Sequence, residues 1–423
     1  MRTRPTLRAL RRDPLGFLGR LAREEGDVAR FALGHEEVVL LSDPKLVREV
    51  LVARHRDFVK QNVLRTRPLE LDPDRGLMMN DDPALHVRGR RIFQPAFSAE
   101  RLRDYATVVA QHARGLAGQW RDGQTIELPS DLRPISLAIL AEAVFKLDLG
   151  SESAVLERRL AELLAPFSFA TSPVHEALAL LRPRGVMRSL RAHASLISRM
   201  QELLRDRRGD GGVDVPSLAA QALDEPNGPT ETQAATDCLG ILLAGVDTTA
   251  TALTWALLEL SRRIDEAERL REEALAADGD PKLLPASRAV FAETLRLYPP
   301  SWYIGRRARD HTGAGGVDFA PGSVALTSPY VIQRDDRFHA EPARFDPERW
   351  RDGELRRGPA YLPFGAGPRQ CLGERLAWLE GTLVLSAITR RWRLEPIDPR
   401  PPRLSPTATL APSTPARLIA RAW

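Results

Sequence analysis

Cysteine is scarce in this sequence. Its 423 residues include only two cysteines, Cys238 and Cys371. Two thiols give no disulfide framework, and they are too few ligands for a structural zinc site. The composition fits a reducing compartment, so we expect a cytoplasmic protein.

Long apolar runs are absent from the N-terminal region. Residues 1–28 read MRTRPTLRALRRDPLGFLGRLAREEGDV, a basic stretch with neither a signal-peptide core nor a span long enough to cross a membrane. We therefore expect no membrane anchor. The net charge of +5 is modest for a chain of this length, and no nucleic-acid-binding motif accompanies it. We expect no nucleic-acid partner.

Linkers and repeats are missing as well. No Gly/Ser-rich linker or low-complexity block divides the chain. One domain spanning residues 1–423 is therefore expected, although length alone would allow roughly two or three. The glycine fingerprint of a dinucleotide-binding fold is also lacking, so we expect no fused flavin or nicotinamide reductase in these residues.

The apolar residues of most segments recur at helical spacing. Short strands are expected at 28–33 and 38–41, between about residue 300 and residue 326, and near the C-terminus. The pattern predicts a mainly helical fold with minor β structure. The expected helices cover residues 14–25, 42–53, 83–97, 99–120, 130–148, 152–168, 186–207, 231–263, 286–297 and 371–390.

One cysteine lies in a glycine-rich loop, FGAGPRQCLG, which ends at Gly373. Gly365 and Gly367 allow backbone angles that other residues resist. Cys371 stands where the apolar helix LGERLAWLEGTLVL is expected to begin, and a helix N-terminus favours thiolate over thiol. Arg369 could bind a carboxylate. For a lone cysteine the plainer interpretation is a buried thiol at a turn, but the full pattern is more specific.

Two further motifs pair charges. Glu293 and Arg296 are three residues apart and share a helix face in AETLRLYPP, and Arg349 follows in FDPERW. His86 and Arg90 are four apart in DPALHVRGRR, so they also share a face. Each pair alone is common on solvated helix surfaces.

A fourth motif, AGVDTT, interrupts the longest apolar helix at residues 244–249. A membrane span is disfavoured because Asp247 would lie near its middle. Gly245 weakens a helix, and Thr248 can bond back to a carbonyl and open the helix locally. Such an opening leaves room for a small molecule and a water.

Together these motifs, in this order, resemble the haem-thiolate monooxygenases of the cytochrome P-450 family over nearly the whole chain. The resemblance implies the cytochrome P-450 fold, with a long central helix over haem b and small peripheral sheets. It implies Cys371 as the iron ligand and dioxygen as co-substrate. Asp247 is expected to relay protons, and Thr248 to hold dioxygen by a hydrogen bond.

The resemblance also implies other roles. Glu293, Arg296 and Arg349 would form a structural network that holds the cysteine loop. Arg307 is an alternative to Arg306 as a propionate partner. The residues expected to bind the cofactor are His86, Arg90, Ala244, Arg306, Phe364, Gly365, Arg369, Cys371 and Gly373.

Insertion of one oxygen atom into a lipophilic small molecule, by hydroxylation or epoxidation, is the implied reaction. A fatty acid, terpenoid, steroid or polyketide would fit. A separate ferredoxin or flavodoxin would supply electrons and dock near Arg356, Arg357 and Arg369, although Arg369 should turn inward if it binds haem. The expected substrate pocket comprises residues 60–80, Phe167, Phe169, Ala244, Trp302, Tyr303, Ile304 and Thr409.

Two alternatives remain open from the sequence. A peroxide-driven haem-thiolate peroxygenase would share the cysteine loop but would not need the acid–alcohol pair Asp247 and Thr248. A haem sensor or carrier without turnover would share the haem site and differ only in forming no product.

Overall fold

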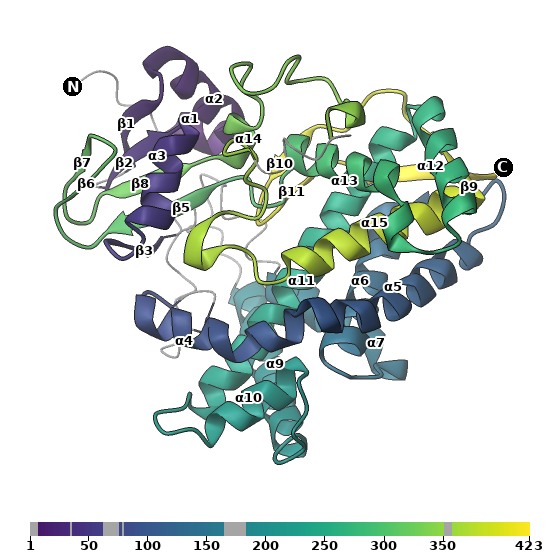
Figure 1. Cartoon of the computed structure of the whole chain (residues 1–423), viewed down its shortest axis with the longest axis horizontal. Helices are drawn as coiled ribbons and strands as arrows, with labels where there is room; N and C mark the ends of the chain where they lie inside the picture. The colour runs from purple at the N-terminus through teal and green to yellow at the C-terminus, as the bar shows by residue number, and fades with distance from the viewer. Residues whose placement is uncertain (1–6, 34–35, 62–75, 78–79, 165–182, 351–357) are drawn as a thin grey trace.

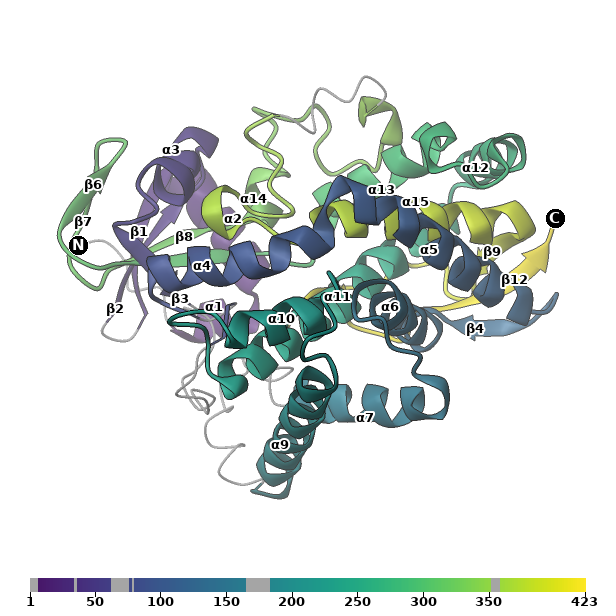
Figure 2. The same cartoon turned by 60° about the horizontal axis from the view of Figure 1, so that its bottom comes forward.

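The computed structural model describes residues 7–33, 36–61, 76–77, 80–164, 183–350 and 358–423. Helices dominate these ranges, and their strands form four small sheets. The prediction of a mainly helical fold with minor β structure is confirmed. Both views place the largest sheet at one end of the molecule and α12 and α15 toward the other (Figure 1, Figure 2).

The largest sheet has five strands in the order β1-β2-β8-β5-β3. β1 and β2 are antiparallel neighbours, whereas β8 joins β2 in parallel from a distant part of the chain. One face packs against α2, whose first turn is capped by the Asp13 carboxylate. The bounds are α1 Leu7–Arg12, α2 Pro14–Glu25, β1 Val28–Leu33, β2 Glu36–Leu41, α3 Pro44–Arg48, β3 Phe58–Gln61, β5 Ile304–Ala308 and β8 Val324–Thr327.

A long helix, α11 (Glu231–Leu260), runs through the middle of the helical part (Figure 1). It begins with a capping box between Thr230 and Gln233, and packs against α6, α9, α13 and α15. The other helices are α4 Pro83–Phe93, α5 Ala99–Gln119, α6 Leu128–Val144, α7 Ser153–Leu164, α9 Pro183–Asp206, α10 Val215–Leu223, α12 Ile264–Ala277, α13 Pro285–Leu297, α14 Pro329–Ile332 and α15 Glu374–Arg391.

The smaller sheets lie at the periphery and join distant segments. β12 pairs with both β4 and β9, and the β10–β11 hairpin contacts α11. Their bounds are β4 Thr125–Glu127, β6 Thr312–Ala314, β7 Val317–Phe319, β9 Trp392–Pro396, β10 Leu404–Pro406, β11 Leu410–Pro412 and β12 Arg417–Ala422.

Several element bounds differ from those expected. The helix expected at 42–53 is α3 followed by one π-helical stretch, Glu49–Ala53, and the end of the helix expected at 83–97 is a 3-10 turn, Gln94–Phe97. The helix expected from Cys371 begins only at Glu374. Helices α1, α10 and α12 were not expected.

One described helix, α11, is long and apolar enough to cross a membrane, but most of its apolar window is buried inside the fold. Its polar residue Asp247 accepts hydrogen bonds from neighbouring elements. The helix therefore has the packing of a core helix.

Candidate functional site

The cysteine loop is built around two glycines with left-handed backbones. Gly365 and Gly367 both have φ of +73°. At Gly367 a Cβ would also overlap the backbone carbonyl of Leu51, so only glycine fits there. The N–H of Cys371 donates to the carbonyl of Phe364 at 2.9 Å, which closes the loop. These constraints fix where the thiol lies.

The Cys371 side chain is accessible, although protein atoms lie densely around its thiol. Burial raises the pKa of this thiol to about 11, and the N–H of Gly373 opposes the rise only in part. The expectation that the helix start by itself favours thiolate is therefore wrong, because α15 begins three residues later at Glu374. A coordinated metal cation would be needed to deprotonate this group.

Basic side chains from three elements gather beside the loop. A pocket is lined by His86 of α4, Arg306 of β5 and Arg369 of the loop, together with Leu51, His55 and others. We call His86, Arg306 and Arg369 the cationic pocket. The Nε2 atom of His86 lies 3.3 Å from the carbonyl oxygen of Pro368. The pocket thus forms where α4 meets the cysteine loop.

Among the described residues, one carboxylate acts on the cationic pocket, that of Asp81, whose charge acts on Arg369. Arg306 donates only to the carbonyl of Gly305, and Arg369 donates to the carbonyl of Asn80 at 2.6 Å. Neither forms an ion pair within the described ranges. Burial, and then the nearby Arg369, lower the pKa of Arg306 to about 10. Arg306 therefore has no described carboxylate beside it, whereas the charge of Arg369 is partly balanced by Asp81.

Arg307 and Arg90 have other partners. Arg307 forms an ion pair with Glu36 at 2.5 Å and donates to the carbonyl of Gly322. Of the two candidates in this strand, Arg306 therefore faces the pocket. Arg90 donates to the carbonyl of Gln370, so it steadies the backbone next to Cys371 instead of lining the pocket.

The residues present fit a haem. An accessible thiol can bind iron, and the guanidinium groups of Arg306 and Arg369 can bind the two propionates that a haem carries. Burying cations without partners is costly, so a site that keeps them is explained by an anionic ligand. The observation that supports this fit is Arg306, which is surrounded by protein and has no carboxylate partner in the described ranges.

The acid and alcohol lie on α11. The Thr248 hydroxyl donates to the carbonyl of Ala244 at 2.6 Å, the back-bond expected for this residue. The helix nonetheless continues without a break from Glu231 to Leu260, so the expected local opening is not a break in the helix. Leu243, Ala244 and Thr248 are partly accessible on a helix that is otherwise largely buried.

Gly245 has a different role from the one expected. A Cβ at this position would lie only 2.6 Å from a methyl carbon of Leu140 on α6. The glycine therefore allows two helices to approach closely, and a weakened helix is not needed to explain it. The approach also brings Arg133 of α6 within reach of Asp247.

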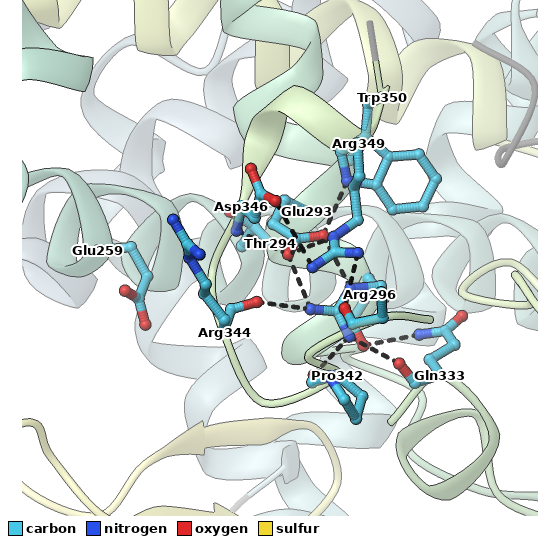
Figure 3. Close-up of polar contacts among 12 residues, drawn as sticks. Glu259, Glu293, Thr294, Arg296, Gln333, Pro342, Arg344, Asp346, Arg349 and Trp350 are labelled. Atoms are coloured by element: carbon cyan, nitrogen blue, oxygen red, sulfur yellow. Dashed lines mark hydrogen bonds and ion pairs between the residues drawn. The ribbon is translucent and has the colours of Figure 1, made fainter. Parts of the chain in front are cut away.

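The charged residues of α13 form a buried network with Arg349 (Figure 3). Arg296 donates to both carboxylate oxygens of Glu293, at 2.7 and 2.8 Å, and Arg349 donates to Glu293 at 3.1 Å. The other N–H groups of Arg296 donate to the carbonyls of Gln333, Pro342 and Arg344. We call Glu293, Arg296 and Arg349 the buried network; every N–H of the Arg296 guanidinium is used.

Sequence reasoning missed the residues that join the buried network to the cysteine loop. The Gln333 side chain donates to the carbonyl of Arg296 and accepts from the N–H of Leu362 at 2.7 Å. The Tyr361 hydroxyl donates to the carbonyl of Ala292 on α13. The neighbouring residues in VIQRDD do not indicate that this glutamine joins the two regions, because its hydrogen-bond partners are far away in sequence.

The expected pocket residues do not share one surface. Trp302 is only 1% exposed and packs in the core of the five-stranded sheet, so its assignment to the pocket is corrected. Tyr303 packs beside it with ring centroids 4.7 Å apart. Ile304 faces Gly365 in the cysteine loop. Thr409 is buried and donates to Asp247 at 3.0 Å.

Some expected residues fall in segments that the structure does not describe. Phe167 and Phe169, most of residues 60–80, and the two docking arginines Arg356 and Arg357 lie outside the described residues. Arg369 turns inward to the cationic pocket, the orientation expected of it as a haem-binding residue.

Comparisons place the chain among known proteins. A family model described as Cytochrome P450 matches residues 7–420. Cyclooctatin synthase from Streptomyces melanosporofaciens is 33% identical, covering 96% of this chain and 91% of that protein. Cyclooctat-9-en-7-ol 5-monooxygenase from the same organism is 30% identical, with 92% and 87% covered. The crystal structure of CYP175A1 from Thermus thermophilus matches with a TM-score of 0.79 at 30% identity, covering 99% and 97% of the two chains.

Proposed function

Since this chain belongs to the cytochrome P450 family, we propose that it binds haem b through Cys371 and inserts one oxygen atom into a lipophilic small molecule. The chain is a monooxygenase, an oxidoreductase that uses a haem-thiolate cofactor and dioxygen. One haem domain over residues 1–423 in the cytoplasm is part of the proposal.

The observation that carries the cofactor assignment is the cationic pocket beside an accessible thiol. His86, Arg306 and Arg369 converge on one pocket, next to the loop that presents Cys371. Arg306 has no carboxylate partner in the described ranges, and Asp81 is the one described carboxylate that acts on Arg369. Haem propionates would supply the missing charges, with Arg90 steadying the loop backbone.

The chain's own groups orient reactants and deliver protons. Bound haem supplies oxygen activation, in which substrate, dioxygen, two electrons and two protons give hydroxylated product and water. Asp247 and Thr248, on the accessible stretch of α11, carry the protons inward. If protons arrive poorly, the same two electrons and two protons leave with dioxygen as hydrogen peroxide.

A terpenoid is the substrate class we favour among those that the sequence left open. The relative named for cyclooctat-9-en-7-ol acts on a ring compound with one double bond and one hydroxyl, by its name. The described pocket-side groups, such as Ala244 and Ile304, are small or apolar, which suits such a molecule. A screen of alkenes and alkenols for a haem spin-state shift tests this proposal.

A separate ferredoxin or flavodoxin is the proposed electron donor. Such donors are commonly acidic, and the chain carries a net charge of +5. We expect the rate of reduction by a surrogate ferredoxin to fall steeply as ionic strength rises. A flat salt response would contradict electrostatic docking.

The carbon monoxide spectrum of the reduced holoprotein tests the cofactor assignment. Thiolate ligation gives a red-shifted Soret band, and we expect that band in the native protein and its loss in Cys371→Ser. Cys238→Ser is the matched control, since Cys238 is the other free cysteine and is buried. A native protein without the band, or a Cys371→Ser protein that keeps it, rejects Cys371 as the ligand.

Product analysis separates the proposed reaction from its two alternatives. A monooxygenase forms product with a reductant and a surrogate ferredoxin. A peroxygenase forms product only with peroxide, and a sensor or carrier forms none. Thr248→Ala should keep haem and divert reductant to hydrogen peroxide, whereas Thr254→Val, a buried threonine of the same helix, should not.

A further inference from the structure

Asp247 is held from two sides by residues distant in sequence. Its Oδ1 atom lies 3.1 Å from Nε and 3.0 Å from Nη2 of Arg133 on α6. Its Oδ2 atom accepts from the Thr409 hydroxyl at 3.0 Å, where the β10–β11 hairpin turns. A helix and a hairpin thus meet at the carboxylate of the α11 motif.

Both holders are fixed in place. Close packing of Gly245 against Leu140 sets the distance between α11 and α6, the helix that carries Arg133. The hairpin is tied to α11 by the indole N–H of Trp255, which donates to the carbonyl of Leu410 at 2.7 Å. The geometry around Asp247 is therefore a consequence of the fold.

The hydrogen of the Thr409 hydroxyl has a defined direction. A hydroxyl carries one hydrogen, and that of Thr409 is donated to Asp247. The Thr251 hydroxyl, 3.4 Å from that of Thr409, must then be the donor in their contact. The chain Thr251 to Thr409 to Asp247 consequently points its hydrogens one way, toward the carboxylate.

The arrangement leaves limited room on the carboxylate. A carboxylate accepts about four hydrogen bonds, two on each oxygen. Arg133 occupies Oδ1 and Thr409 occupies one position of Oδ2, so one position of Oδ2 remains. A proton donor such as water can reach Asp247 there in a fixed direction.

We propose that Arg133 and Thr409 are positioning residues for proton delivery by Asp247. This inference rests on the proposed function of the Asp247–Thr248 pair. Thr409 thereby acts on oxygen chemistry through Asp247 and not by contact with substrate, which corrects its sequence-based assignment. Arg133 is the outer holder, with a side chain 48% exposed, while that of Asp247 is 17% exposed.

The first test removes the Thr409 hydroxyl in the holoenzyme. Thr409→Val should send severalfold more reductant to hydrogen peroxide during turnover with cyclooctat-9-en-7-ol and a surrogate ferredoxin. Thr409→Ser keeps the hydroxyl and should restore coupling. Thr254→Val is the control, because Thr254 is equally buried on α11 but bonds only to the carbonyl of Ala250. Peroxide per reductant is measurable even if this probe is not hydroxylated.

Ligand affinity separates positioning from substrate contact. The dissociation constant of 4-phenylimidazole, read from the haem spectrum, should be the same in Thr409→Val and native protein within about twofold, since Asp247 and not the ligand touches the hydroxyl. A roughly tenfold change would show that Thr409 lines the pocket, and it would overturn the inference.

The second test removes the outer holder. Arg133→Gln should raise the peroxide yield, and Arg133→Lys should restore it in part, because lysine keeps the charge but not the paired contacts. Arg199→Gln is the control: Arg199 is 46% exposed, similar to Arg133, but its ion pairs are with Glu152 and Glu202 and not with Asp247. Equal peroxide yields in Arg133→Gln and Arg199→Gln would remove Arg133 from the proposal.

A double-mutant cycle tests the contacts without turnover. We expect the effects of Thr409→Val and Asp247→Asn on the unfolding equilibrium constant of the holoprotein to be non-additive by about fivefold. Additive effects overturn the inference whatever the turnover data show.

The relay and its positioning fail in different ways. If Thr248→Ala leaves coupling unchanged, the proposed relay is wrong and the inference falls with it. If Thr248→Ala diverts electrons to peroxide but Thr409→Val and Arg133→Gln do not, only the positioning is wrong.

Discussion

Two groups of arginines flank the cysteine loop, and they are balanced differently. In the buried network, Glu293 neutralises charge from Arg296 and Arg349, and all five N–H groups of Arg296 donate. In the cationic pocket, Arg306 has no carboxylate partner in the described ranges, and Arg369 is balanced only in part by Asp81. The first group is complete within the chain, whereas the second is complete only with an anion.

The difference separates structure from binding. A saturated network has no donor left for a ligand, so it can only hold elements together. An unneutralised cluster costs stability until an anion arrives, so its retention indicates a ligand. The buried network reaches Leu362, two residues before the cysteine loop, through Gln333, whereas Arg369 is itself part of that loop.

The largest effect should come from unbalancing the buried network. Glu293→Ala leaves two arginines without their carboxylate, a loss of roughly 3–5 kcal/mol in the free energy of unfolding, and haem should not be retained. Denaturation midpoints and Soret absorbance measure both. Glu341→Ala, in an exposed pair with Arg344, is the control and should have little effect. A stable, haem-loaded Glu293→Ala protein would contradict the network's role.

Cutting the link between network and loop should cost less. Gln333→Leu leaves the buried carbonyl of Arg296 and the buried N–H of Leu362 without this hydrogen-bond partner. The free energy of unfolding should fall by about 1–3 kcal/mol. Haem should also dissociate faster. Gln201→Leu serves as control, since Gln201 makes one long contact of 3.5 Å to Thr232. Matching denaturation curves for the two variants would show that Gln333 does not stabilise the link between the buried network and the cysteine loop.

Neutralising the cationic pocket should affect haem more than the fold. Arg306→Gln removes a charged partner for a propionate, and we expect haem transfer to excess apomyoglobin to accelerate about tenfold. The urea midpoint should change little, because no carboxylate in the described ranges loses its partner. Arg307→Gln, which instead breaks a pair with Glu36, should show the reverse pattern. Similar behaviour of the two variants would remove the contrast between the groups.

The last prediction concerns a buried carboxyl group that has no cation beside it in the described ranges and whose effect appears only as the pH is varied. Burial raises the pKa of Glu380 to about 8 from 4.5, and its contact is a 2.5 Å hydrogen bond from Ser136. The folded state binds the Glu380 proton more tightly than the unfolded state does. The protonated carboxyl therefore contributes its full share to the free energy of unfolding below the pKa of the unfolded state. That contribution is lost as pH rises through the pKa of the folded state. The loss is up to about 1.4 kcal/mol per pH unit. Denaturation of Glu380→Gln from pH 5 to pH 9 should show a flatter profile; an unchanged slope would refute this.

The sequence predicted elements whose apolar periodicity is strong and missed those whose buried face is small. Helix α2 begins and ends where expected, since Asp13 and Pro14 mark its start. Helix α12 was missed although Ala267, Leu270 and Ala274 recur at helical spacing, because alanines give a weak apolar signal among many charges.

Residue types in motifs could be predicted, but their tertiary partners could not. The sequence placed Glu293 beside Arg296 because three residues along a helix make them neighbours. It could not choose between Arg306 and Arg307, since that depends on which strand face meets Glu36. It also assigned Thr409 to the pocket, although the hairpin turns its hydroxyl toward Asp247.

The contact between Gly245 and Leu140 has a consequence for engineering. Randomising the active-site helix is a natural way to alter what this enzyme oxidises, but a side chain at residue 245 meets the methyl groups of Leu140 on a neighbouring helix. The Leu140 side chain must then move or be shortened. Libraries that vary residue 245 should therefore vary residue 140 as well.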